Sequence, residues 1–418
     1  MSLIKTSIYS GISTFISLVV KLITNKVTAV YLGTSGMFLL GQLKDFINIA
    51  DISSNLGSTK GVVKYIAEYK DRPKKYKQFI ASAFKIQLIS STIVCVITIV
   101  FKDQISNYFF EDIKFSGALV VFGFSFITYT IHNFFMSVFN GLKDIKIYVI
   151  INIIISILTA AVVIYFVIEY NIIGAFYAIA INQIIALFIS LSFIASIKPF
   201  RFKDLVPSIK KEHFKNLTKF SFMTLSGPLC MVSATLFIRF FLADEFDDNH
   251  AGSWEGMWRL SNMYILFLTT TFQFYLIPTF SNISGNDLKQ EIFKVWKLSI
   301  PIIVIITCGV YVLKDFIITF IFSKEFLLIN SIILFHLLGD AIKINAWVLG
   351  NVLISKAKTT VFIAFQIGWA VTFCVFTFIL VKQYGFVGVS MAYFATYILH
   401  FLIMNIYFRK LLWINSKT

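Results

Sequence analysis

Long runs of apolar residues, separated by short polar stretches, make up almost the whole chain. A run of about 20 apolar residues is long enough to cross a bilayer as a helix. The runs predict about twelve membrane-spanning helices, at residues 7–31, 37–62, 78–101, 115–139, 147–168, 172–196, 217–242, 256–280, 295–313, 326–353, 360–381 and 386–408. The connections are too short for an independent soluble domain, so we expect an all-α integral membrane protein.

One segment of the chain occurs twice. The sequence EYNIIGAFYAIA, which starts at Glu169, returns as QYGFVGVSMAYF, which starts at Gln383. A long apolar run precedes each copy, and a short basic stretch precedes each run. Duplicated sets of apolar helices are common in membrane transporters. The repeat therefore indicates two related bundles of six helices each.

A basic, proline-containing stretch at residues 198–215 separates six predicted spans from six. We expect an N-terminal bundle at 1–197 and a C-terminal bundle at 216–418, joined by 198–215 as a cytoplasmic linker. Because six is an even number, both bundles enter the membrane in the same direction. They are then parallel repeats around a central cleft.

Composition supports this fold class, since 58% of the residues are hydrophobic and only 14% are charged. The net charge of +16 could indicate nucleic-acid binding. The basic residues, however, gather in alternate loops, and acidic residues such as those from Asp244 to Asp248 lie in the others. Basic loops of membrane proteins face the cytoplasm. We therefore expect both termini in the cytoplasm and no nucleic-acid partner.

The first predicted span carries a polar face. Ser10, Thr14, Ser17, Lys21 and Thr24 recur at steps of three and four residues, which places them on one side of a helix. This spacing predicts that the span lines a polar cleft through much of the membrane depth.

Lys21 is the charged residue of this face. It lies ten residues before Tyr31, roughly 15 Å along a helix. A lysine that faces lipid at such a depth costs on the order of 3 kcal/mol. We expect Lys21 to face the cleft and attract a substrate, or to form a structural ion pair with Asp45 or Asp51.

The second predicted span has a polar side of its own, which includes Asp45, Asn48 and Asp51. Two polar-faced helices in one bundle predict a hydrated cavity. Two roles are open for the carboxylates in this cleft: they neutralise Lys21, or they bind a coupling ion.

Charged residues also lie within predicted spans of the second half. Glu255 and Arg259 have the i,i+4 spacing of a local ion pair. Arg239 lies near the outer end of its span, where it is either structural or part of the cleft. In the tenth span, His336, Asp340 and Lys343 fall within two helical turns. Asp340 and Lys343 are candidates for a substrate-binding site, unless they only neutralise each other.

The sequence lacks the residue patterns of several kinds of chemical site. The histidines are scattered singly and the four cysteines lie inside apolar spans, so we expect no metal site. The sequence contains no glycine-rich phosphate loop ending in Lys-Ser or Lys-Thr. We expect no cofactor, and a transporter rather than an enzyme.

Five short motifs occur along the chain: SLIK from Ser2, KYIAEYKD from Lys64, NGLKD from Asn140, LLGD from Leu337 and YFATYIL from Tyr393. They resemble motifs of the Wzx-type polysaccharide flippases, which include O-antigen and enterobacterial common antigen lipid III flippases. The resemblance covers essentially the whole chain. It implies the fold of the multidrug, oligosaccharidyl-lipid and polysaccharide exporter superfamily.

The resemblance also implies a substrate and a location. The substrate is undecaprenyl diphosphate bearing an oligosaccharide, moved from the cytoplasmic to the periplasmic leaflet of a bacterial inner membrane by alternating access. Lys21, with Arg239 or Lys343, would receive the diphosphate. A glycan polymerase and a chain-length regulator are the protein partners that the resemblance implies.

Two other functions compete with this one. A cation-coupled multidrug exporter of the same superfamily would be expected to carry a buried carboxylate in the first span, where this chain has Lys21 and no acid. A membrane-embedded glycan polymerase or ligase would need an outer catalytic loop. The acidic segment from Asp244 to His250 is too short to resemble one.

Overall fold

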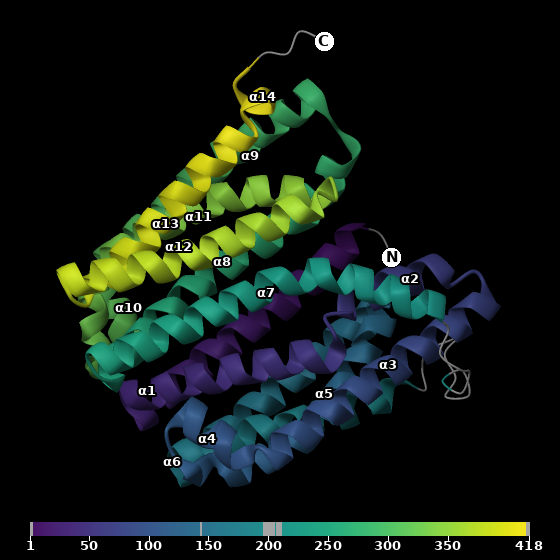
Figure 1. Ribbon diagram of the computed structural model, residues 1–418, viewed down its shortest axis with the longest axis horizontal. Coiled ribbons are helices and arrows are strands. Elements are labelled where there is room, and N and C mark those ends of the chain that lie inside the picture. The colour runs from purple at the N-terminus through teal and green to yellow at the C-terminus, as the bar shows by residue number, and fades with distance from the viewer. Residues whose placement is uncertain (1–2, 143, 195–204, 206–210, 415–418) are drawn as a thin grey trace. The chain divides into compact units, whose positions relative to one another are not determined.

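The computed structural model describes residues 3–142, 144–194, 205 and 211–414. Every regular element in this part of the chain is helical (Figure 1). Helices suit a bilayer because they satisfy all backbone hydrogen bonds within one segment. The helices of the first half are α1 (Leu3–Asn55), α2 (Thr59–Tyr69), α3 (Pro73–Val100), α4 (Lys102–Phe110), α5 (Ser116–Gly141) and α6 (Ile145–Ile194).

The second half continues the all-helical pattern. Its helices are α7 (Lys211–Glu245), α8 (Asp248–Asn282), α9 (Gly285–Val312), α10 (Lys314–Ile321), α11 (Ile329–Ser355), α12 (Thr359–Tyr384), α13 (Val387–Tyr407) and α14 (Arg409–Leu412). Among the described residues, nine helices are long and apolar enough to cross a membrane. The chain is therefore a multi-pass membrane protein of the all-α class, as the apolar runs predicted.

Two of these nine helices, α1 and α6, are interrupted. Gly33 breaks α1 with φ 63° and ψ −165°, and Asn171 breaks α6 with φ 53° and ψ −139°. Glycine adopts this conformation without steric cost, whereas a residue with a Cβ, such as Asn171, is strained in it. The amide of Asn182 donates to the carbonyl of Thr159 at 3.4 Å, so the two arms of α6 pack side by side. The count of twelve spans stays a prediction.

The predicted span at 37–62 is wrong at its C-terminal end. The helix stops at Asn55, and the next two residues, Leu56 and Gly57, have φ values of 51° and 60°. The Asn55 side chain accepts a hydrogen bond from the backbone N–H of Gly57 at 2.7 Å, which stabilises the turn. Apolar content alone did not reveal this stop, because Val62 and Val63 continue the apolar pattern in α2.

The chain divides into two compact units, which we call unit 1 (Met1–Leu32 and Leu39–Leu229) and unit 2 (Gly33–Phe38 and Cys230–Thr418). The boundary lies within α7, whereas the predicted linker at 198–215 lies outside the described residues except for 205 and for 211–215, which belong to α7. The first part of α7 thus packs with unit 1.

Each unit has its own apolar core. In unit 1, α2, α3, α5 and α6 bury a cluster that includes Phe79, Phe134 and Phe139. In unit 2, α8, α9, α11 and α13 bury a second cluster around Trp296, whose indole N–H donates to the backbone carbonyl of Asn345 at 3.1 Å.

The repeated sequence has the same local structure in both units. Gly174 and Gly388 each lie against a backbone carbonyl eight residues earlier, where an added Cβ would come within 2.1 Å and 2.2 Å of the oxygen. The N–H of Asp144 bonds the carbonyl of Phe139 at 2.9 Å, and that of Lys358 bonds Leu353 at 2.9 Å. A constant offset of 214 residues relates Gly174 to Gly388 and Asp144 to Lys358.

Candidate functional site

Lys21 lies in the first arm of α1 and its side chain is exposed. Among the described residues it forms no ion pair, so the alternative of a structural pair with Asp45 or Asp51 is not observed. Asp45 is 3% exposed. Lys21 therefore keeps its cationic group available, which is the condition for attracting an anion.

The rest of the predicted polar face is less uniform. Ser17 hydrogen-bonds Ser156 of α6 at 3.0 Å, and the Thr24 hydroxyl donates to the carbonyl of Val20 at 2.9 Å. Asn48 is half-buried. The side chains of Ser10 and Thr14 lie outside the described part of the chain.

Asp51 lies at the start of a polar network in unit 1. Its carboxylate accepts hydrogen bonds from the amides of Asn55 at 3.1 Å and Asn133 at 3.3 Å. Asn133 belongs to α5 and connects Asp51 to the interior of the unit. Asp51 is thus held by amides rather than by Lys21.

Asn133 also lines a cavity between α5 and the two arms of α6, which we call the amide pocket. Its volume is about 350 Å³. The lining residues are Tyr129, His132, Asn133, Met136, Tyr148, Asn152, Ile155, Thr159, Ile179, Asn182, Gln183 and Ala186. Four of them carry side-chain amides. Polar side chains are costly to bury within a membrane and commonly mark functional sites there. The sequence analysis missed this pocket.

Unit 2 contains a buried charged triad. The guanidinium of Arg239 lies 3.1 Å from one oxygen of Glu255, and Arg259 Nε lies 2.8 Å from the other. The side chains of Arg239 and Glu255 are 1% and 0% exposed. The predicted i,i+4 pair of Glu255 and Arg259 is confirmed. Arg239 joins this pair from α7.

Asp340 lies at the centre of a second buried cluster in unit 2. Its carboxylate accepts hydrogen bonds from the hydroxyls of Ser261 at 2.7 Å, Tyr264, and Tyr393 at 2.7 Å. Lys343 does not contact the carboxylate directly. Its ammonium donates to the Tyr393 hydroxyl at 3.1 Å, so Tyr393 connects the two charged groups.

Aromatic rings surround the Lys343 ammonium. The rings of Trp258, Tyr393 and Tyr397 have centroids 5.3 Å, 5.6 Å and 5.7 Å from Nζ, within reach of cation–π attraction. His336, the third member of the predicted trio, does not bond Asp340. It is fully buried, and its ring stacks on that of Tyr393 with 4.2 Å between the ring centroids.

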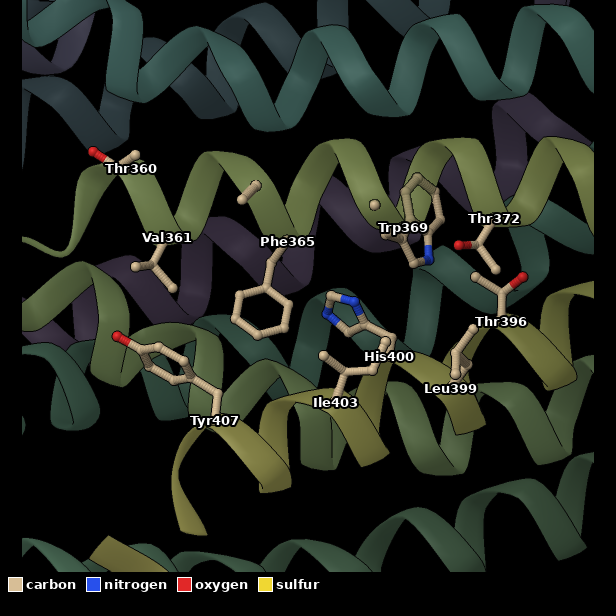
Figure 2. A pocket seen from close by; sticks show the side chains of 12 residues that line it. Thr360, Val361, Phe365, Trp369, Thr372, Thr396, Leu399, His400, Ile403 and Tyr407 are labelled. Carbon is tan, nitrogen blue, oxygen red and sulfur yellow. The ribbon is translucent and has the colours of Figure 1, made fainter. Parts of the chain in front are cut away.

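A different cavity, of about 440 Å³, lies between α12 and α13 of unit 2. Figure 2 shows Phe365 and Trp369 of α12 facing His400 and Ile403 of α13 across this space. Most of its lining is hydrocarbon or aromatic, and no carboxylate or lysine lines it. The cavity is suited to an apolar chain rather than to a charged group.

The sequence model of the polysaccharide biosynthesis protein family matches residues 40–330. The lipid III flippase of Escherichia coli K12 is 27% identical over 410 residues, which cover 96% of this chain and 97% of the relative. The resemblance to the polysaccharide flippases that the motifs indicated is therefore confirmed.

Solved structures agree on the fold. An inward-facing multidrug resistance MATE family transporter of the MOP superfamily has a TM-score of 0.78 at 13% identity, over 94% of this chain and 95% of that one. The lipid II flippase MurJ, in an inward closed conformation, has a TM-score of 0.70 at 16% identity. That match covers 97% of this chain and 87% of MurJ. At these identities the likeness establishes the exporter fold and not the substrate.

Proposed function

We propose that this chain, which belongs to the polysaccharide biosynthesis protein family, is a flippase for a lipid-linked oligosaccharide. The observation that carries the proposal is the similarity to a lipid III flippase along nearly the full length of both chains. The substrate is undecaprenyl diphosphate bearing an oligosaccharide. The chain moves it from the cytoplasmic to the periplasmic leaflet of a bacterial inner membrane by alternating access.

The chemistry of such a lipid supports this proposal. It joins an anionic diphosphate to a polar glycan and a long apolar tail, so a carrier needs a cation, polar surface and apolar surface. The described residues supply an exposed lysine on α1, the amide pocket in unit 1 and the apolar cavity in unit 2.

Within this proposal, Lys21 binds the diphosphate. Arg239 and Lys343 are weaker candidates, because Arg239 contacts Glu255 and Lys343 contacts Tyr393. Asp340 and Asp51 then orient neighbouring groups through their hydrogen bonds. Neutral polar residues such as Asn48 contribute to the path of the glycan.

The proposal includes an orientation and partners. Both termini face the cytoplasm, because the basic loops alternate with acidic ones along the sequence. A glycan polymerase and a chain-length regulator would take up the flipped unit at the periplasmic face, and consumption there would draw the transport forward.

The sidedness of the lipid-linked oligosaccharide in cells depleted of this chain tests the proposal. A membrane-impermeant glycosidase or lectin reports how much of the lipid faces the periplasm in spheroplasts. We expect the lipid to accumulate on the cytoplasmic leaflet after depletion and to return outside when the wild-type chain is restored.

The same assay separates the competing functions. Loss of a polymerase would leave single repeat units outside. Loss of a drug exporter would leave sidedness normal and would instead sensitise cells to toxic cations. Either result would overturn the flippase proposal.

A further inference from the structure

We infer that the amide pocket of unit 1 binds a pyranose ring of the glycan on the lipid, an inference that rests on the proposed function. The structure assigns to this pocket the recognition of a neutral polyol rather than of the diphosphate. The hydrogen bonding of its side chains, its volume and the comparison with unit 2 carry the inference.

Three of the four side-chain amides of the pocket are oriented in one sense, whereas the oxygen of Gln183 accepts a hydrogen bond from the Ser125 hydroxyl at 2.7 Å. Asn152 donates to the carbonyl of Tyr148 at 2.9 Å, Asn182 donates to the carbonyl of Thr159 at 3.4 Å, and Asn133 donates to Asp51 at 3.3 Å. Each amide nitrogen is thus engaged with the protein. Among the described residues no group donates to the oxygens of Asn152 and Asn182, which are left to accept hydrogen bonds from a guest.

Two fully buried acceptors in the pocket have no protein partner among the described residues. They are Oδ1 of Asn182, whose side chain is 7% exposed, and Nδ1 of His132, which is 6% exposed. The other ring nitrogen of His132 has a partner, since the imidazole hydrogen-bonds the backbone of Ala186. Buried polar atoms without partners are costly, so their presence in a cavity indicates a ligand that satisfies them.

A guest for these acceptors must bring hydrogen-bond donors. A diphosphate at neutral pH brings almost none, whereas a sugar carries a hydroxyl on most ring carbons. The rings of Tyr129 and His132 stack at 5.9 Å and form part of the wall. Aromatic walls suit the apolar C–H face of a pyranose. Acceptors and aromatic surface together therefore favour a sugar.

The volume of about 350 Å³ agrees with a sugar-sized ligand. It falls at the lower end of the range of roughly 300–1,000 Å³ that small-molecule pockets occupy. A single cation or water needs only a small fraction of this space, since a water molecule occupies about 30 Å³ in the liquid. One or two sugar rings match the cavity better than an ion does.

The repeat shows that the fold does not require such a pocket. At the offset of 214 residues, Gln183 of unit 1 corresponds to Tyr397 of unit 2, and Tyr129 corresponds to Lys343. In unit 2 these positions form the packed cation–π cluster, with Tyr397 8% exposed. The amide lining is therefore a property of the unit 1 sequence, since the cavity of unit 2 has Thr396 at the position of Asn182.

Binding to two lipids tests the inference. The purified chain in nanodiscs is titrated with undecaprenyl diphosphate bearing the oligosaccharide of the producing strain, and with undecaprenyl diphosphate that bears no sugar. Asn152→Ala removes one acceptor from the pocket. We expect it to weaken binding of the glycan-bearing lipid by about 5- to 30-fold and to change binding of the sugar-free lipid by less than about twofold.

Asn405→Ala is the matched control. Asn405 also lies half-buried in a membrane helix and donates to the carbonyl four residues earlier, that of Phe401, at 2.8 Å. It lines neither cavity. We expect this variant to bind both lipids as the wild type does. Asn182→Ala provides a second pocket variant if Asn152→Ala fails to fold.

Three outcomes would overturn the inference. The pocket variants could weaken the binding of both lipids equally, or they could weaken the binding of neither. They could also abolish a sodium dependence of lipid binding by the wild type without affecting lipid selectivity. If the wild type binds neither lipid, the proposed function itself fails. If the wild type prefers the glycan-bearing lipid and the pocket variants keep that preference, only the pocket is wrong.

Discussion

Asn171 and Gly385, 214 residues apart, hold nearly the same left-handed backbone conformation, with φ and ψ of 53° and −139° in one and 62° and −150° in the other. This region of backbone space is essentially confined to glycine. Each residue follows a tyrosine and turns one membrane helix into the next. The same turn therefore occurs in both halves of the chain, with glycine in one copy, where it is unstrained, and asparagine in the other, where it is strained.

Gly385→Ala is expected to destabilise the protein by about 1–3 kcal/mol, because alanine resists this backbone conformation. Gly368→Ala is the matched control, since an added Cβ meets nothing within 4 Å at either position and Gly368 lies in a regular helix. The control should be neutral or gain about 0.5–1 kcal/mol. Thermal unfolding in detergent measures both. Equal effects of the two changes would mean that the turn carries no strain.

Glu255→Gln is expected to destabilise unit 2 by about 3–5 kcal/mol, because the buried guanidinium of Arg239 and the partly buried one of Arg259 both contact the carboxylate that it removes. Glu291→Gln serves for comparison. Glu291 pairs at 3.4 Å with Lys294, whose side chain is 72% exposed, and such a pair contributes about 0–1 kcal/mol. Unfolding midpoints of the two variants should differ clearly. Similar midpoints would show that the triad is not a stabilising centre.

Lys21→Ala is expected to reduce periplasmic exposure of the lipid-linked oligosaccharide at least about tenfold, which corresponds to about 1.4 kcal/mol, while the protein level stays normal. Lys21→Arg should retain much of the activity, because it keeps the charge. Lys75→Ala, an exposed position at the start of α3, is the control for loss of a positive charge. Full transport by Lys21→Ala at normal expression would remove Lys21 from the substrate site.

Asp247 is expected to make the start of α8 sensitive to acid. A side-chain hydrogen bond from His250 at 2.8 Å and a backbone one from the same residue at 2.9 Å hold the pKa of Asp247 below its usual value of 3.8. A lowered pKa in the folded state means that the stabilisation is complete above this usual value and is lost as pH falls through the folded-state pKa.

Asp247→Asn measures this contribution, because asparagine still caps the helix but does not titrate. On acidification from about pH 5 to about pH 3, the unfolding midpoint should fall slightly more in the wild type than in Asp247→Asn. The corresponding difference in the free energy of unfolding should be under about 1 kcal/mol, since the carboxylate is half exposed. An identical acid response in the two proteins would contradict the prediction.

Local spacing in the sequence was a reliable guide where partners lie one helical turn apart. Glu255 and Arg259 pair as their i,i+4 spacing predicted. The same reasoning was incomplete for Asp340 and Lys343, because the hydroxyl that joins them belongs to Tyr393 on another helix. No periodicity along α11 could indicate that residue.

The amide pocket shows the same limit more fully. Its polar residues come from α5 and from both arms of α6, so they converge only after the chain turns back at Asn171. Asparagines and glutamines inside apolar spans were a usable signal, since such residues are rare and expensive at membrane depth. The polar face of α1 attracted attention because its residues share one helix, whereas those of the pocket do not.

The sequence by itself determined the class of the protein. Apolar runs of spanning length form helices in a bilayer, and the duplicated segment forms the same positive-φ turn in both halves, without steric cost at Gly385 and with strain at Asn171. Tertiary structure decided which polar groups meet. Hydrogen bonds and ion pairs act over a few ångströms, so packing between helices decided that Arg239 reaches Glu255 and that the amides of unit 1 surround a cavity.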